Sequence, residues 1–283
     1  MALETVRVKL TIAYDGRAYS GWQIQKTGLG VQQRVEEAFG KVFSAPVRIH
    51  SSSRTDAGVH ALGMVAHADL DAGLFRMSPS KLALALNAHL PQDIRIVSAR
   101  RCSGRFHARF DAERKQYRYL VWNHAAHNPL LRELCWHIPQ KLNVSVMRQC
   151  APLFLGKRDF KSFAGTRPYE MDSTVRTLFR CDVRKQGSLL TFIIEGDGFL
   201  YKMCRGIVGT LVQVGQGKIL PEAVPGMLAS RDRRSGGMSA PAQGLILWKV
   251  RYPSTAAESS GSAFEKEGAA PPVEEAAQKT RTS

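Results

Sequence analysis

The sequence predicts a mixed α/β (α+β) fold that consists of two similar halves. Apolar and polar side chains alternate along 6–14 and again along 117–121, which is typical of a β-strand. In each half, segments with helical spacing of apolar side chains separate further strand-like runs. The resulting order, β-α-β-β-α-β, is the ferredoxin-like supersecondary pattern, and it occurs twice. We therefore expect two ferredoxin-like (RRM-like) halves with adjoining antiparallel sheets and a central basic cleft.

Local signals define the elements of the first half. Asp15-Gly16 ends the first strand, and Ser78 followed by Pro79 is typical of a helix start. Pro91 then stops that helix. The expected elements are strands at 6–14, 46–49, 64–70 and 94–97, and helices at 31–42 and 79–90.

The second half repeats this order without strong sequence identity to the first. Gly156 and Gly187 mark the end of a helix and a turn between two strands. The expected elements are strands at 117–121, 175–183, 189–195 and 245–250, and helices at 144–155, 199–214 and 221–229. We predict an N-terminal domain over 1–108 and a C-terminal domain over 109–252. Joining their sheets edge to edge would remove two exposed strand edges.

Charge points to a polyanion as the partner. The 283-residue chain has a net charge of +16, and residues before 253 hold 37 basic and 19 acidic side chains. Such an excess favours nucleic acid, since no basic amphipathic helix or lipidation signal favours a membrane. Residues 253–283 are rich in Ala, Ser, Pro and Glu, so we expect a disordered tail there.

Cysteine usage and hydropathy point to the cytoplasm. The five cysteines are widely spaced, without a Cys-x-x-Cys pair, so we expect reduced thiols and no metal site. His60, His67 and His89 have no metal-ligand spacing either. Apolar runs are shorter than a membrane span, and Arg7 and Lys9 interrupt any signal-peptide core.

One loop carries an unusual combination of side chains. Arg54-Thr55-Asp56-Ala57-Gly58-Val59-His60 lies between two predicted strands, with small residues around a closely spaced Arg and Asp. An arginine can orient a neighbouring carboxylate through charge-assisted hydrogen bonds. An ordinary turn, with Asp56 as a cap and Gly58 at positive φ, is the simpler interpretation of such a loop.

This string resembles the catalytic motif of the TruA family of tRNA pseudouridine synthases. Seven consecutive residues match, which is a specific signal. The resemblance covers about 6–252. Further stretches that fit the family are 14–16, 21–23, 87–91, 106–110, 117–119, 159–163 and 199–209; residues 167–171 align with a tRNA-contacting segment but match no clear pattern.

The resemblance implies an activity and a role for each site residue. The family converts uridine to pseudouridine at positions 38, 39 and 40 of the tRNA anticodon stem-loop, as a homodimer without a cofactor or metal. Asp56 would be the nucleophile, Arg205 its ion-pair partner and Tyr117 a ring that stacks on the target base. The residues that would contact tRNA are Arg54, Phe106, His107, Ala108, Arg109 and Phe110.

Other interpretations remain to be weighed. Asp15, Asp111 and Asp197 are competing carboxylates, each with a simple role at a turn or strand end. A non-catalytic RNA-binding protein with two RRM-like halves should have a Lys/Arg-Gly-Phe string with alternating aromatics, which the sequence lacks. A glycosidase would need a second acid paired with Asp56, and none stands out. Whether the carboxylate attacks the ribose or the uracil ring is left open.

Overall fold

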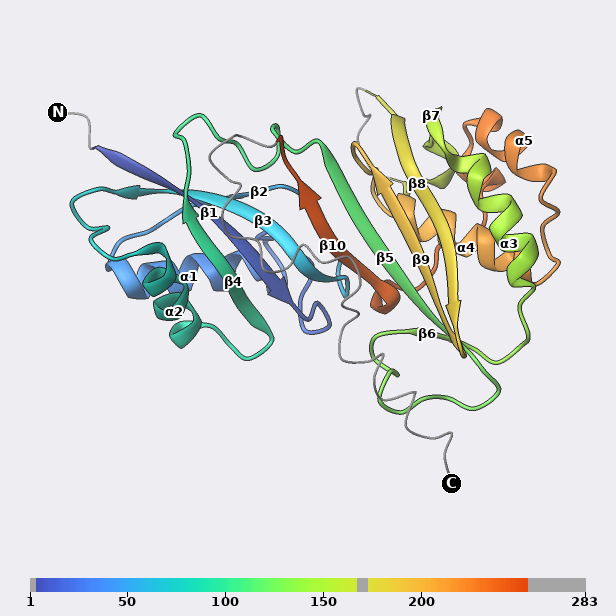
Figure 1. The fold of residues 1–283 in the computed structure, drawn as a ribbon, viewed down its shortest axis with the longest axis horizontal. Helices are drawn as coiled ribbons and strands as arrows, with labels where there is room; N and C mark the ends of the chain where they lie inside the picture. The colour runs from blue at the N-terminus through green and yellow to red at the C-terminus, as the bar shows by residue number, and fades with distance from the viewer. Residues whose placement is uncertain (1–3, 167–172, 254–283) are drawn as a thin grey trace.

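One continuous sheet runs through both halves of the molecule. The computed structural model describes residues 4–166 and 173–253 (Figure 1). The main path of the ten-stranded sheet is β4-β1-β3-β10-β5-β9-β8-β7, while β2 pairs with β3 and β6 pairs with β5. The strands are β1 Thr5–Tyr14, β2 Ile49–Ser51, β3 His60–Asp71, β4 Ile94–Arg101, β5 Arg114–Asn123, β6 Trp136–Ile138, β7 Gly156–Asp159, β8 Val175–Gln186, β9 Leu189–Gly196 and β10 Leu245–Arg251.

Helices lie beside each half of this sheet. Figure 1 shows α1 and α2 with the strands of the first half, and α3, α4 and α5 with those of the second. Their bounds are α1 Val31–Phe43, α2 Pro79–His89, α3 Val144–Cys150, α4 Met203–Gly215 and α5 Ala223–Ser230. Ser78 caps α2 as predicted, because its Oγ accepts a hydrogen bond from the backbone N–H of Lys81 at 3.3 Å.

The last strand joins the two halves. β10 lies between β3 and β5 (Figure 1), parallel to β3 and antiparallel to β5. Ile246 is in register with His60, and Leu247 with Ala61. The halves therefore adjoin edge to edge, as predicted, through a parallel pair of strands. At this junction Gly63 is required, since a Cβ there would lie 2.5 Å from the carbonyl oxygen of Trp248.

Two helices differ from the expectation. The helix expected at 199–214 begins at Met203, because Lys202 adopts a left-handed conformation with φ of 59°. The helix expected at 144–155 ends at Cys150, where a 3-10 turn, Ala151–Phe154, takes over. Pro152 explains the change, since it has no N–H to continue the α-helical hydrogen bonds.

The core follows the predicted periodicity. Val8, Leu10 and Ile12 are fully buried, as expected for one face of β1. Helices α1 and α4 also contribute buried apolar faces to the main core. The expected tail, from residue 254, and the 167–171 segment lie outside the described residues. Among the described helices, none is long and apolar enough to cross a bilayer.

Candidate active site

The loop between β2 and β3 is held by contacts from the first strand and the segment after it. The hydroxyl of Tyr14 and Oγ1 of Thr55 lie 2.7 Å apart in a buried hydrogen bond. The backbone N–H of Trp22 donates to the carbonyl of Thr55 at 3.1 Å, and the N–H of Val59 donates to the carbonyl of Asp56 at 3.1 Å. These bonds fix the backbone on both sides of Asp56.

Glycines allow this close packing. Gly21 has a φ of +102°, and a Cβ there would lie 2.5 Å from the carbonyl oxygen of Thr55. A Cβ on Gly16 would lie 2.0 Å from the carbonyl oxygen of Val59. The segments 14–16 and 21–23 therefore form the support of the Asp56 loop, which gives a physical reason for the glycines in both.

Asp56 faces an arginine from the other half of the chain. Oδ2 of Asp56 lies 3.5 Å from Nη1 of Arg205, which belongs to α4. The exposed fraction is 21% for the Asp56 side chain and 14% for Arg205, so both are largely sheltered but within reach of a ligand. The predicted proximity of these two residues is confirmed.

Arg205 is itself held in place by the segment before β10. Its Nε donates to the carbonyl of Ala240 at 2.7 Å, and the N–H of Ala240 donates to the carbonyl of Arg205 at 3.0 Å. The guanidinium is therefore anchored at one end and directed to Asp56 at the other. A fixed cation can orient a carboxylate and favour its ionised form.

Tyr117 lies on β5 near this ion pair. Its ring packs edge-on against Phe199, with 5.0 Å between the ring centres. Burial raises the pKa of Tyr117 well above 10, and the charge of Asp56 adds to this effect. Tyr117 and Tyr119 are both buried, with exposed fractions of 6% and 1%. They differ in their contacts, because the hydroxyl of Tyr119 donates to the carbonyl of Pro241 at 2.9 Å.

The 106–110 segment combines a buried anchor with an exposed tip. The N–H of Ala108 donates to Nδ1 of His67 at 3.2 Å, and its carbonyl accepts from the hydroxyl of Tyr252 at 2.7 Å. Phe110 is 73% exposed, and Arg109 beside it is exposed as well. The guanidinium of Arg109 lies 5.6 Å from the centre of the Phe110 ring. This end of the segment presents a cation and an aromatic ring to solvent.

The remaining predicted contact residues lie in three different surroundings. Phe106 packs on Tyr252, with 5.0 Å between ring centres, while His107 packs on Phe110 at 4.3 Å. Arg54 is exposed on the Asp56 loop.

The competing carboxylates have structural partners. Asp15 pairs with Arg17, Oδ2 of Asp111 accepts from the N–H of His107 at 2.8 Å, and Oδ1 of Asp197 accepts from the N–H of Thr177 at 2.9 Å. These contacts explain each acid as a turn or strand-end residue. None of the three is paired with Arg205 in the described structure.

Two further residues lie near the loop: His60, the last residue of the motif, and Lys115, which sequence reasoning missed. His60 is buried, and its Nδ1 accepts a hydrogen bond from the N–H of Gly16 at 3.2 Å. Burial lowers the pKa of His60, although the charge of Asp15, whose Oδ1 lies 3.1 Å from Nδ1, opposes this. Lys115 donates to the carbonyl of Ser52 at 2.7 Å. Lys115 precedes Tyr117 by two positions, so strand alternation could have placed both on one face.

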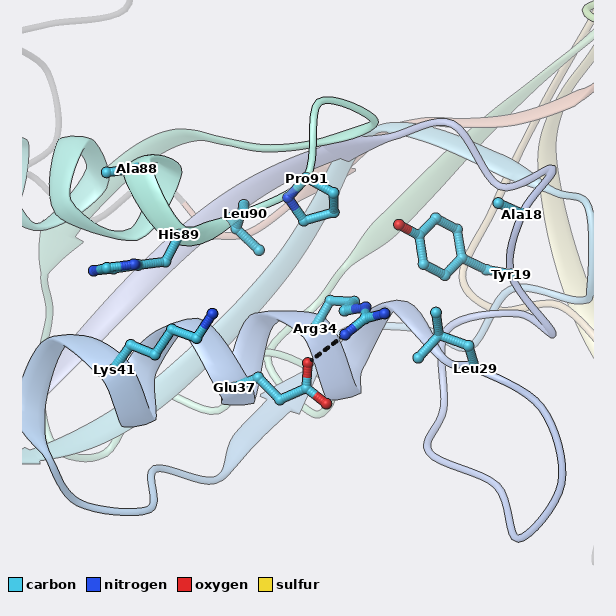
Figure 2. A pocket seen from close by; sticks show the side chains of 10 residues that line it. All are labelled: Ala18, Tyr19, Leu29, Arg34, Glu37, Lys41, Ala88, His89, Leu90 and Pro91. Atoms are coloured by element: carbon cyan, nitrogen blue, oxygen red, sulfur yellow. Dashed lines mark hydrogen bonds and ion pairs between the residues drawn. The ribbon is translucent and has the colours of Figure 1, made fainter.

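A pocket in another part of the molecule does not hold these residues. Figure 2 shows it between α1 and α2, with a volume of about 440 Å³. It is lined by Ala18, Tyr19, Leu29, Arg34, Glu37, Lys41, Ala88, His89, Leu90 and Pro91. Among the described residues, no group of three or more His, Cys, Asp or Glu is arranged to hold a metal ion.

Comparison with known proteins identifies the family. The model of a family described as tRNA pseudouridine synthase matches residues 10–111 and 150–253. The chain belongs to this family. The match includes the Asp56 loop, Arg205 and both segments that support the loop. Pseudouridine synthases are isomerases, so this chain is an enzyme of that class.

Curated relatives agree over nearly the whole described chain. A tRNA pseudouridine synthase A from Geotalea uraniireducens is 43% identical over 87% of this chain and 99% of its own length. Proteins of the same name from Geobacillus kaustophilus and Chlamydia trachomatis are each 43% identical over 88% of this chain, and over 95% and 93% of their own lengths.

Proposed function

We propose that the protein converts uridine to pseudouridine at positions 38, 39 and 40 of the tRNA anticodon stem-loop, with Asp56 as the nucleophile. The observation that supports this most directly is the Asp56–Arg205 pair, in which the two halves place one sheltered carboxylate against one anchored guanidinium. Family membership supports tRNA as the substrate, as do the names of the relatives.

The reaction requires a group that holds the uracil or the ribose while the base turns. The N1–C1′ bond breaks and a C5–C1′ bond forms, while C5 loses its proton and N1 gains one, so the product is an isomer of the substrate. A carboxylate can form the temporary covalent bond, either with C1′ of the ribose or with the uracil ring. Asp56 supplies this carboxylate, and Arg205 directs it and balances its charge.

Tyr117, Arg54 and the 106–110 segment bind the substrate in this proposal. A base taken out of a helix loses its stacking, and an aromatic ring compensates for this loss. Tyr117 has this role, while the contacts to the rest of the tRNA come from Arg54 and the 106–110 segment.

We also propose that the enzyme is a homodimer that works in the cytoplasm. Cys135, Cys150, Cys181 and Cys204 are buried thiols rather than disulfides, which fits a reducing compartment.

Mapping of pseudouridines tests the proposal. A tRNA transcript incubated with the purified full-length protein should gain pseudouridine at 38, 39 or 40. The Asp56→Asn variant should form none while its tRNA affinity stays within about twofold of wild type. Asp182→Asn, which removes a carboxylate paired with Arg180 on β8, is the control and should keep full activity. Appreciable turnover by Asp56→Asn would exclude the nucleophile assignment, and pseudouridine only at other sites would exclude the proposed positions.

A further inference from the structure

Lys115 lies beside the Asp56 loop, where neither the family motif nor the proposed chemistry gives it a role. It is two positions before Tyr117 on β5, so both side chains point to the same face of the sheet. Its Nζ donates to the carbonyl of Ser52 at 2.7 Å, at the start of the loop that holds Asp56. One donor of the ammonium group is thus used and two remain.

The surroundings of Lys115 are rich in positive charge. The pKa of Lys115 is lowered to about 8, and burial is the largest cause. The charges of Arg109 and Arg176 contribute to this decrease, while the charge of Asp197 opposes it. Within the described residues, no carboxylate forms an ion pair with Lys115. The charges of Arg109 and Arg176 therefore act on Lys115 more strongly than the opposing charge of Asp197.

Arg176 lies two strands away from Lys115 in the sheet, since Lys115 is in register with Gly196 of β9 and Gly196 with Leu178 of β8, two positions after Arg176. Its Nη1 donates to the carbonyl of Val175 at 2.6 Å and to that of Ser173 at 3.1 Å. The side chain passes over Gly198, where a Cβ would lie 3.3 Å from its Cδ and Nε. Oδ1 of Asp197 accepts from the N–H of Thr177 at 2.9 Å, so this carboxylate is bound to the backbone of β8. Such an arrangement costs free energy unless an anion binds.

We propose that Lys115 donates directly to a backbone phosphate of the RNA substrate beside the Asp56 loop, with Arg176 and Arg109 adding positive charge around the site. Lysine binds phosphate as a compact point charge, and arginines can contribute planar pairs of donors. Because Lys115 also holds Ser52, the bound phosphate is tied to the loop that carries the nucleophile. The site thus sets the position of the target nucleotide. This inference rests on the proposed function, which supplies the RNA.

The salt dependence of tRNA binding measures the contact without requiring turnover. Each phosphate contact contributes about 0.7 to 0.9 to the slope of log affinity against log salt. In Lys115→Met, tRNA affinity at low salt should fall about tenfold and the slope should decrease by about this amount. Lys115→Arg should restore most of the slope. Lys185→Met, which removes an exposed lysine on β8, should leave it unchanged.

A purely structural role for Lys115 gives a different result. If Lys115 only held Ser52, Lys115→Met would lower Tm and kcat while the salt slope stayed at the wild-type value, and the proposal would be wrong.

Should Lys115→Met fail to fold, the comparison of wild type with Lys115→Arg decides. Wild-type tRNA affinity should weaken as pH rises above about 8, where free Lys115 loses its proton, and Lys115→Arg should show no such loss. If tRNA affinity changed with pH to the same extent in wild type and in Lys115→Arg, the proposed phosphate site would also be wrong.

The two proposals fail separately. A wild-type protein that forms no pseudouridine in tRNA would reject the proposed function, whatever the salt slope. An active wild-type protein whose affinity and slope do not change in Lys115→Met would reject only the phosphate site.

Discussion

The hydroxyl of Tyr14 and Oγ1 of Thr55 lie 2.7 Å apart, and this buried contact joins β1 to the residue before Asp56. A carboxylate that must meet one atom of a substrate benefits from a loop with little freedom. The contact therefore links the packing of the first strand to the orientation of the proposed nucleophile.

Tyr14→Phe should weaken catalysis more than substrate binding. The change removes one hydroxyl and leaves Oγ1 of Thr55 without this partner in a buried position, which costs about 1 kcal/mol of unfolding free energy. We expect kcat to fall while KM for tRNA changes little, since the ring still fills its place in the core. Steady-state kinetics and urea unfolding measure the two effects. Wild-type kcat in a folded Tyr14→Phe protein would show that this hydrogen bond does not orient the loop.

Gly21→Ala should disrupt the same loop from its other side. A Cβ at this position would meet the carbonyl of Thr55 at 2.5 Å, and the φ of +102° is unfavourable for alanine. We expect a loss of about 2 kcal/mol or more in unfolding free energy, together with a large loss of kcat.

The control for Gly21→Ala is Gly226→Ala. Gly226 is on α5, where a Cβ would have no atom within 4 Å. Alanine is favoured over glycine in a helix, so this variant should be more stable by about 0.5 to 1 kcal/mol and fully active. Equal stability of the two variants would contradict the assigned role of Gly21.

Periodicity was sufficient to predict the arrangement of elements in both halves. The alternation around Val8 and Tyr119 and the helix start at Ser78 are local signals, and local packing follows them. The start of α4 could not be predicted, because nothing in the sequence marks Lys202 for a left-handed conformation. Strands β6 and β7 were missed since they have only three and four residues and depend on pairing with β5 and β8.

The site could be predicted only where a motif or a resemblance marked it. Asp56 and Arg205 are 149 positions apart, so no local pattern could bring them together. The anchor of Arg205 is the backbone carbonyl of Ala240, which has no side-chain signal in a sequence. Lys115 belongs to no motif, and only its position two residues before Tyr117 on the same strand face marks it in the sequence.

Arg205→Met should impair chemistry and stability together. The methionine has a similar volume but leaves Asp56, with an exposed fraction of only 21%, without the guanidinium, and leaves the carbonyl of Ala240 without its side-chain donor. We expect an activity loss of at least about a hundredfold and a loss of about 1 to 3 kcal/mol in unfolding free energy.

Arg205→Lys is the matched variant, because it keeps the charge but cannot reach both Ala240 and Asp56 with a planar group. It should recover part of the stability and little of the activity. A wild-type Tm together with wild-type activity in Arg205→Met would remove Arg205 from the site.

Unfolding free energy should depend on pH through His67, whose exposed fraction is 2%. Its Nδ1 accepts from the N–H of Ala108, so protonation of this atom breaks the anchor of the 106–110 segment. Burial lowers the pKa of His67 to about 4, and the positive charges of Arg7, His107 and His50 add to this, while Asp69 opposes it.

The sign follows from proton binding by the two states. Between about pH 6.5 and pH 4 the unfolded chain binds a proton at His67 and the folded chain does not, so stability decreases as pH falls. The contribution is complete above about pH 6.5 and is lost by pH 4, with a size of about 3 kcal/mol at most. In His67→Asn, Oδ1 replaces Nδ1 as the acceptor without titrating. Urea unfolding from pH 7 to 4.5 should therefore show a shallower decline in the variant than in wild type. Parallel curves would mean that the neutral His67 ring does not carry this dependence.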